Sequence, residues 1–317
     1  MPQGSVLGPL LYVLFTADIP QIIQSAGLNA HQYADDVQAY IHCRAAEAVS
    51  AMDQLNTVLE RLHGWMKSNR LKLNPDKTQF IWIGNRFQLP KIDMHLLSTT
   101  FPGVNFQDSV LDLGVTLDQE LSMSAHIGNI CRSGFYQLRQ LRLVRRNLTD
   151  KAAAMLVHSF VMSRVDYCNS VLSGVTKQQF DRVQRILNAA ARLLLRIPRF
   201  GHISAAVRDT LHWLPVPSRV SFKICNFVWS CVTGAGPAYL QELCVLSAAG
   251  SVYRLRSSDG FLLKVPRCRT TTMQRRGFSV VGPSSWNGLP LQIREMLGEG
   301  RSAATFKKQL KTFFFSK

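Results

Sequence analysis

The chain has 317 residues, 46% of them hydrophobic, and a formal net charge of +17. This length allows a sizeable core and two or three domains. The seven cysteines form no C-x-x-C pair and no Cys/His array with zinc spacing, which excludes a zinc finger of that kind and predicts buried free thiols in a reducing compartment.

The first apolar run extends from Val6 to Phe15 and invites a signal-peptide interpretation. No basic residue precedes it, Pro9 interrupts it, and it falls far short of the roughly 18 apolar residues that a membrane span needs. We therefore expect a buried core helix here, and neither secretion nor a membrane partner.

The next feature is a pair of adjacent carboxylates, Asp35 and Asp36, between two short apolar and aromatic runs. Adjacent like charges repel, so neither carboxylate stabilises the other in a tight turn. A divalent cation neutralises both, and Mg²⁺ prefers carboxylate and phosphate oxygens. A solvated Asp-Asp hairpin turn is the alternative, and the alternation on both sides predicts a hairpin in either case.

The remaining periodicities predict mainly helices. Apolar residues recur at three- and four-residue steps from Val49 to Met66, which indicates a long amphipathic helix. Two strands are expected next, Thr78 to Ile83 and Val110 to Leu117. From about residue 122 the pattern is helical, apart from short Gly, Ser and basic runs over 247–285 with a strand-like Phe261 to Val265; the expected helices lie at 127–141, 154–165, 183–194, 220–231 and 303–315.

The positive charge is unevenly distributed. Residues 1–125 hold 8 Lys/Arg and 12 Asp/Glu, residues 126–230 hold 16 and 4, and residues 231–317 hold 13 and 4. An acidic segment that carries the Asp pair, followed by strongly basic segments, suits a metal-binding face beside a surface that binds a polyanion. A solvated basic surface is the alternative, but arginine dominates, and its planar fork suits phosphate.

Four motifs occur in a characteristic order: PQGSVLGP, YADD, LKLNPDKT and LGVTLD. This order resembles the reverse transcriptase of non-LTR retrotransposons. The segments LHWLPVPSRVSFKICNFVW and GFSVVGPSSWNGLP, with the terminal SAATFKKQLKTFFF, look like the tail of vertebrate-type, LINE-like elements of this group. The resemblance therefore extends over the whole chain.

The resemblance implies roles for individual residues. Asp35 would be the main ligand of Mg²⁺, or of Mn²⁺, and Asp36 a secondary one. Tyr33 would lie near the primer end, and Lys77 near the phosphates of the incoming nucleotide as a charge stabiliser or proton donor. The residues expected beside the template base, the nucleotide or the primer backbone are Gln3, Gly4, Leu113 and Gly114, the last two opening a hairpin that grips the primer.

Each role has an ordinary structural alternative. Gly4 and the Gly8-Pro9 pair also punctuate a helix start. Lys77 follows an Asn-Pro-Asp turn and could be a surface lysine. Leu113 and Gly114 could belong to a plain strand with a bulge.

The resemblance implies an α+β fold: a partial polymerase palm of antiparallel strands plus helices at 1–121, a helical thumb at 122–200, and a basic, mainly helical C-terminal region at 201–317. The implied function is RNA-directed DNA polymerase, with an RNA template, a DNA primer and dNTP as partners, inside the cell in nucleus or cytoplasm. An endonuclease would belong to the full-length protein.

Two alternatives stay open. The family takes a third metal-binding aspartate from a strand upstream of the PQG motif, and Met1 stands directly before that motif. The chain could therefore be a catalytically inactive nucleic-acid-binding remnant that lacks the fingers and this aspartate. Asp18 follows the motif and is a weak substitute. A basic helical interaction module unrelated to polymerases would require the four ordered motifs to be a coincidence. We expect the chain alone not to polymerise DNA.

Overall fold

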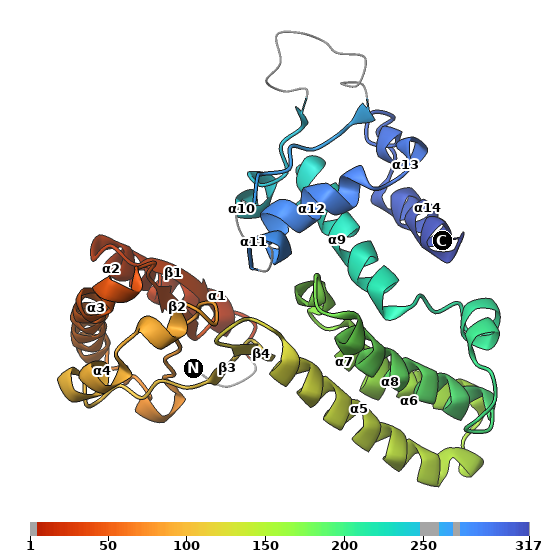
Figure 1. Ribbon diagram of the computed structural model, residues 1–317, viewed down its shortest axis with the longest axis horizontal. Helices are drawn as coiled ribbons and strands as arrows, with labels where there is room; N and C mark the ends of the chain where they lie inside the picture. The colour runs from red at the N-terminus through yellow and green to blue at the C-terminus, as the bar shows by residue number, and fades with distance from the viewer. Residues whose placement is uncertain (1–4, 248–259, 269–272, 317) are drawn as a thin grey trace. The chain divides into compact units, whose positions relative to one another are not determined.

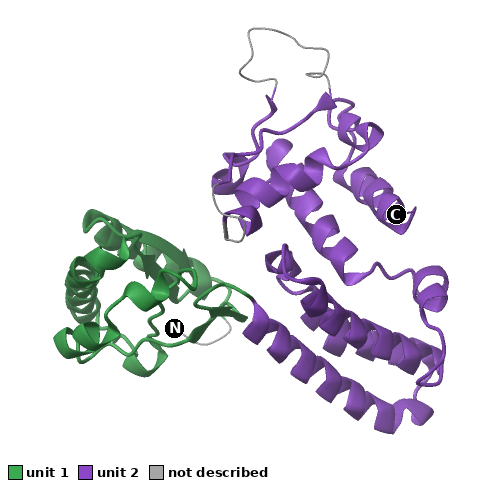
Figure 2. Cartoon of the chain, viewed as in Figure 1, with its two compact units in different colours: residues 1–122 green, residues 123–317 purple. Residues whose placement is uncertain are grey.

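The computed structural model describes residues 5–247, 260–268 and 273–316. Its contacts divide the chain into two compact units, residues 1–122 and 123–317 (Figures 1 and 2). The first unit contains two small antiparallel sheets and the second is mainly helical, which confirms the α+β class. A boundary at residue 200 between thumb and C-terminal region remains a prediction.

The first unit is built around one long helix. Its element order is α1 (Gly8–Phe15), α2 (Ile19–Ser25), β1 (Asn29–Tyr33), β2 (Asp36–Tyr40), α3 (Ala48–Ser68), α4 (Met94–Thr100), β3 (Ser109–Asp112) and β4 (Val115–Asp118). The α3 helix matches the predicted amphipathic helix. Its residues Val58 and Leu62 pack with Ile23 of α2, while Met52 packs with Leu97 of α4. One helix thus organises both small cores of this unit.

The prediction of a buried helix at the N-terminal apolar run is wrong in one respect. The helix forms as α1, but none of its residues is buried, and Leu10 and Leu14 are 64% and 73% exposed. An apolar sequence predicts a tendency to be buried, whereas burial needs another surface that covers it. In the described residues, no helix is long and apolar enough to cross a membrane.

Two of the predicted strands also need correction. The segment Thr78 to Ile83 is not a strand, because it makes only the isolated bridge between Phe80 and Phe106. The run Val110 to Leu117 is not one strand but two, β3 and β4, which a turn at Leu113 and Gly114 connects into a hairpin. The first segment lacks a strand partner along its length, and the second reverses direction.

The second unit is a series of helices. Its order is α5 (Ser124–Val144), α6 (Asp150–Val157), a π-helical turn (His158–Met162), α7 (Ser163–Asp166), α8 (Lys177–Leu195), a second π-helical turn (Ala206–Thr210), α9 (Val216–Val232), α10 (Ala238–Gln241), α11 (Met273–Arg276), α12 (Phe278–Asn287), α13 (Leu291–Glu295) and α14 (Ala303–Ser316). The predicted helices all occur, whereas the strand expected at Phe261 to Val265 is reduced to a bridge between Leu246 and Leu263.

The helices α5 and α8 run parallel along their whole length (Figure 1). At their starts, the Gln179 side chain donates a hydrogen bond to the Ser124 hydroxyl at 2.7 Å. In the middle, Gly134 lies against Ile186, and a Cβ atom at Gly134 would come within 3.0 Å of that side chain. The missing side chain therefore allows the two helices to approach closely.

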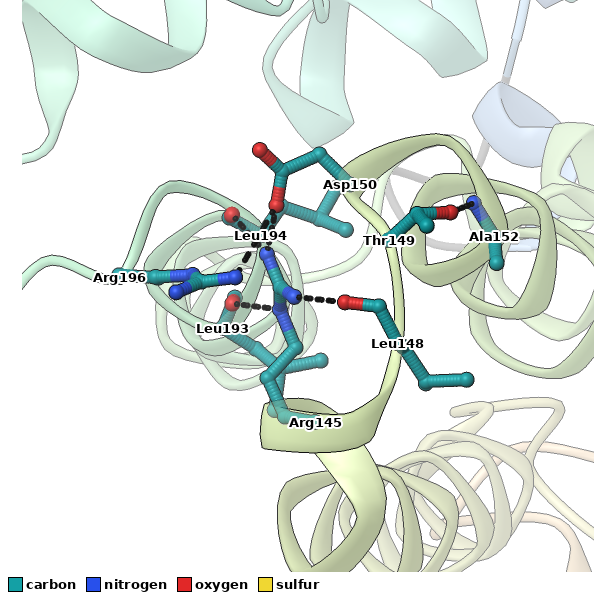
Figure 3. A network of polar contacts seen from close by, with 8 residues as sticks. All are labelled: Arg145, Leu148, Thr149, Asp150, Ala152, Leu193, Leu194 and Arg196. Atoms are coloured by element: carbon teal, nitrogen blue, oxygen red, sulfur yellow. Dashed lines mark hydrogen bonds and ion pairs between the residues drawn. The ribbon is translucent and has the colours of Figure 1, made fainter.

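The ends of the same two helices are joined by Arg145, which is 7% exposed (Figure 3). Its Nε donates to the Leu193 carbonyl at 3.1 Å and its Nη2 to the Leu194 carbonyl at 3.0 Å, which satisfies two carbonyls at the C-terminus of α8. Its Nη1 donates to the Leu148 carbonyl at 3.1 Å, and its guanidinium also forms an ion pair with Asp150. This hydrogen bond and the positive charge hold the pKa of the Asp150 carboxyl below its usual range.

The C-terminal part of this unit has an aromatic core. The Trp229 ring of α9 stacks on Phe306 of α14 with centroids 4.2 Å apart, and Trp286 of α12 is fully buried beside them. All seven cysteines are free. Three of them, Cys225, Cys231 and Cys244, are buried as expected, whereas the other four are only partly buried. Burial raises the pKa of the Cys225 thiol to about 12, so this thiol is unreactive at neutral pH.

We expect the nearly buried His126 near the start of α5 to make stability depend on pH. Burial lowers its pKa below the ordinary value of 6.5, so the folded chain holds a neutral imidazole. The unfolded chain takes up a proton near pH 6.5, so this contribution to stability is complete above that pH. It falls below pH 6.5, by up to about 1.4 kcal/mol per pH unit, until the pKa of the folded state is passed. Urea unfolding between pH 5 and 8 measures the slope, and a His126→Gln variant with an unchanged slope would contradict this assignment.

Candidate catalytic hairpin

The acidic pair lies at the tip of the β1–β2 hairpin, as predicted. Tyr33 and Asp36 form the last pair of the ladder, which leaves Ala34 and Asp35 as a two-residue turn. Ala34 has a φ of +53°, in the left-handed region that favours glycine, so the turn is held in a costly conformation for an alanine. Both carboxylates and the Tyr33 ring are exposed, which leaves their oxygens open to a ligand.

A side chain next to the turn holds it against the end of α1. The Gln32 amide donates to the hydroxyl of Thr16 at 2.8 Å and to the Ala34 carbonyl at 3.2 Å. Thr16 is fully buried, and its own hydroxyl donates to the Tyr12 carbonyl at 2.9 Å. Burial raises the pKa of the Tyr12 phenol, and the negative charge of Asp35 adds to the effect, which places this ring near the turn.

The second hairpin meets the first through another glutamine. The Gln38 amide of β2 donates a hydrogen bond to the Asp112 carboxylate at the end of β3. Leu113 and Gly114 follow directly, with φ values of +44° and +81°, and form the turn that leads into β4. The structure therefore links the hairpin of the acidic pair to the hairpin of Leu113 and Gly114. These two residues form the turn of their hairpin, and the alternative of a plain strand is excluded.

The structure gives less information about the other candidate residues, Lys77, Gln3 and Gly4. Lys77 ends a short 3₁₀ turn that begins at Pro75, where the Asn74 side chain accepts a hydrogen bond from the Asp76 backbone N–H at 3.0 Å. Its side chain is exposed, and its position beside the acidic pair remains a prediction. Gln3 and Gly4 lie outside the described residues.

Comparison with known proteins shows which family the segment that contains this hairpin resembles. The family model described as reverse transcriptase (RNA-dependent DNA polymerase) matches residues 1–117, which include the first hairpin and all of the second except Asp118. Residues 1–117 are therefore similar to a reverse transcriptase, and we call them the reverse transcriptase segment. No solved structure matches the chain.

The curated relatives extend the similarity beyond this reverse transcriptase segment. The chain is 28% identical over 224 residues, or 66% of its length, to the probable RNA-directed DNA polymerase from transposon BS of Drosophila melanogaster. It is 30% identical over 204 residues, or 60% of its length, to the RNA-directed DNA polymerase from mobile element jockey of Drosophila funebris. The matches span 24% and 21% of these two relatives. The chain is thus related to reverse transcriptases of non-LTR retrotransposons, and its likeness to vertebrate-type elements remains a prediction.

The acidic pair of the reverse transcriptase segment offers the type of ligand that a magnesium site needs, but too few ligands. Asp35 and Asp36 supply the hard carboxylate oxygens that Mg²⁺ prefers. Among the residues that the structure describes, no group of three or more His, Cys, Asp or Glu is gathered where it could hold a metal ion. The nearby Asp112 carboxylate accepts the hydrogen bond from Gln38. The described residues therefore offer two ligands and do not complete a site for two ions.

The sequence reasoning missed the two glutamines of this reverse transcriptase segment. Gln32 and Gln38 flank the acidic pair on β1 and β2, and each reaches a residue distant in sequence: Thr16, 16 positions away, and Asp112, 74 positions away. Polar residues within two short strands that flank a metal-binding turn are the only sequence signal for such a role.

Proposed function

We propose that this chain supplies part of the catalytic centre of an RNA-directed DNA polymerase. Such an enzyme transfers a nucleotidyl group from a dNTP to the 3′ hydroxyl of a primer on an RNA template. The carrying observation is the position of Asp35 and Asp36 at an exposed hairpin turn within the segment that matches the reverse transcriptase family. The setting is intracellular, in nucleus or cytoplasm, where an RNA template and the DNA target are found.

The roles of the single residues follow from this proposal. Asp35 and Asp36 would hold Mg²⁺, or Mn²⁺ in its place, which when bound stabilises charge on phosphate oxygens. Tyr33, with its exposed ring, would contact the primer end, and Lys77 would act on the phosphates of the nucleotide. The turn of Leu113 and Gly114 would contact the primer backbone, and its link through Gln38 would fix its distance from the metal ligands.

Titration with Mn²⁺, followed by electron paramagnetic resonance, tests the metal-binding part. The wild-type chain should bind the ion weakly, and Asp35→Asn or Asp36→Asn should weaken binding about tenfold or more, since each removes a charged ligand. Asp53→Asn is a matched control, because it removes the same charge from an exposed position on α3. If all three variants bind Mn²⁺ alike, the acidic pair is not a metal site.

The basic second unit supports binding of a polyanion independently of the metal. Residues 126–230 hold 16 Lys/Arg against 4 Asp/Glu, and each phosphate that they neutralise releases counterions. We expect binding of RNA or DNA without metal ions, insensitive to sequence, with a log–log salt slope of roughly 0.7 to 0.9 for each phosphate contact. Fluorescence titration at several salt concentrations measures the slope, and a flat dependence would rule out electrostatic binding.

A further inference from the structure

The helix α5 has an unusual charge composition. From Ser124 to Asn147 the sequence contains five arginines and no Asp or Glu. The α8 helix, which packs against α5, adds Arg182 and Arg185, whose positive charges oppose the effect of burial on the pKa of the Cys131 thiol and so lie close to it. The region around this helix therefore carries a net positive charge, even with Asp150 paired to Arg145 and Asp181 present on α8.

The outward side of α5 combines three of its region's arginines with exposed aromatic rings. The buried side, which includes Ile127, Ile130, Leu138 and Leu141, faces the helices of the second unit. Residues at three- and four-residue steps on the opposite side share one stripe. We call this set the outer stripe; it consists of Arg132, Phe135, Tyr136, Arg139, Leu143 and Arg146, all of them exposed. Arg146 lies in the 3₁₀ turn Arg145–Asn147 that follows α5 directly.

The rings of the outer stripe do not belong to the core. Phe135 is 43% and Tyr136 58% exposed, although the same helix buries its other side well. Among the described residues, the guanidinium groups beside them have no paired carboxylate, although Arg132 donates a hydrogen bond to the Asn129 side chain at 3.4 Å. In the described part of the chain, no ion pair involves Arg132, Arg139 or Arg146, in contrast to Arg145, which Asp150 neutralises.

The pattern distinguishes between possible ligands. A helix that lies in a membrane surface separates a continuous apolar side from its charged side. In the outer stripe, arginines interrupt the apolar residues at every turn. Alternating cations and flat rings instead match a strand of nucleic acid, because phosphates attract the guanidinium groups and unpaired bases stack on aromatic side chains. A duplex hides its bases and would use the arginines alone.

We propose that the outer stripe of α5 binds single-stranded nucleic acid, with Phe135 and Tyr136 stacking on unpaired bases and Arg132, Arg139 and Arg146 contacting phosphates. The stripe spans 14 residue steps from Arg132 to Arg146, about 21 Å at 1.5 Å per residue, which gives room for several nucleotides. This inference rests on the proposed function in one respect, namely that the ligand is a nucleic acid.

The test compares two probes on the full chain in the presence of EDTA. One is a labelled oligouridylate of about a dozen nucleotides, which leaves its bases unpaired, and the other is an RNA–DNA duplex of the same length. The double variant Phe135→Ala/Tyr136→Ala should bind the single strand about tenfold or more weakly and the duplex within about twofold of wild type. Alanine is the better helix former, so α5 should stay folded, and circular dichroism checks this.

Three further variants sharpen the result. Phe135→Trp/Tyr136→Trp keeps the stacking surface and should bind the single strand as wild type does. Arg139→Gln should weaken both probes and lower the salt slope for the single strand by about 0.7. Tyr239→Ala is the matched control, because it removes an aromatic ring that is 66% exposed on α10. It should change neither affinity.

The outcomes separate this inference from the proposed function. Suppose that the wild type binds the single strand. If the double alanine variant binds it equally well, or loses affinity for both probes equally, the proposal of base stacking on α5 is wrong, whereas the proposal of polyanion binding is unaffected. If the wild type binds neither probe, both fail. A third outcome would assign the outer stripe to lipid instead. In that case the wild type binds vesicles of phosphatidylserine and phosphatidylcholine, and the double alanine variant loses this binding but still binds RNA.

Discussion

Replacing Arg145 by alanine is expected to destabilise the second unit by about 3 kcal/mol, since it removes a nearly buried charged group with four hydrogen-bonded partners. The carbonyls of Leu193 and Leu194 at the end of α8 would lose the donor that Arg145 supplies, and water reaches them poorly at this buried position. Arg145→Lys should have an intermediate effect, because an ammonium group lacks the planar fork that reaches several carbonyls at once.

Urea unfolding followed by circular dichroism measures the change, and amide hydrogen exchange locates it in the last turn of α8. Arg196→Ala is the control, because Arg196 contacts the same Asp150 at 3.5 Å from a side chain that is 64% exposed. Such an exposed ion pair adds little to stability, because water screens it. If both variants shift the unfolding midpoint by the same amount, Arg145 is not the group that joins α5 to α8.

Primer extension by the isolated chain should be undetectable, a loss on the order of a thousandfold or more relative to a complete polymerase. A two-metal mechanism needs several carboxylates that hold both ions in place, and the described residues gather only Asp35 and Asp36 at the turn. The pair can anchor one ion weakly, but a ligand that bridges to a second ion is missing from this set.

The assay uses an RNA template and a DNA primer with Mg²⁺ or Mn²⁺, and Asp35→Asn is the control. Extension by the wild type that the control lacks would show that the expectation of inactivity is wrong and that the assignment of Asp35 is right. Extension by both would indicate a contaminating polymerase. Absence of extension together with metal-independent RNA binding would fit an inactive nucleic-acid-binding remnant.

The helices could be predicted where one local pattern determines them. The apolar residues of α3, α5 and α8 recur at helical steps, and burial of one side suffices to stabilise each helix against its neighbours. The helix α12 was missed, since Gly282 and Pro283 look like helix breakers in the sequence. A proline costs a helix one backbone hydrogen bond, and the burial of Trp286 in the aromatic core offsets that loss.

Strands were harder to predict, because a strand depends on a partner that the local sequence does not specify. The run Thr78 to Ile83 has strand-like composition, but only Phe80 finds a partner. The alternation from Val110 to Leu117 continues through a reversal at Leu113, where a leucine takes a positive φ. The burial of α1 was predicted wrongly for the same reason, since a local apolar run contains no information about what covers it.

In the candidate site, too, features set by the local sequence could be predicted and contacts between distant segments could not. The hairpin of Asp35 and Asp36 follows from local alternation and was predicted correctly. The contacts of Gln32 and Gln38 depend on how distant segments meet, which periodicity does not encode. The roles of Tyr33, Lys77, Leu113 and Gly114 toward primer and nucleotide came from family resemblance and remain predictions.

The parallel arrangement of α5 and α8 has a consequence for how the second unit folds. Residues that join the two helices are 48 to 55 positions apart in the chain, as in the contacts of Arg145 with Leu193 and of Ser124 with Gln179. The chain must therefore complete α5, reverse through α6 and α7, and reverse again before α8 can add its contacts. The loop-closure entropy of this segment is lost before those contacts form, which slows folding relative to an antiparallel helical hairpin. During synthesis, α5 leaves the ribosome well before its partner does and exposes an apolar side over that interval.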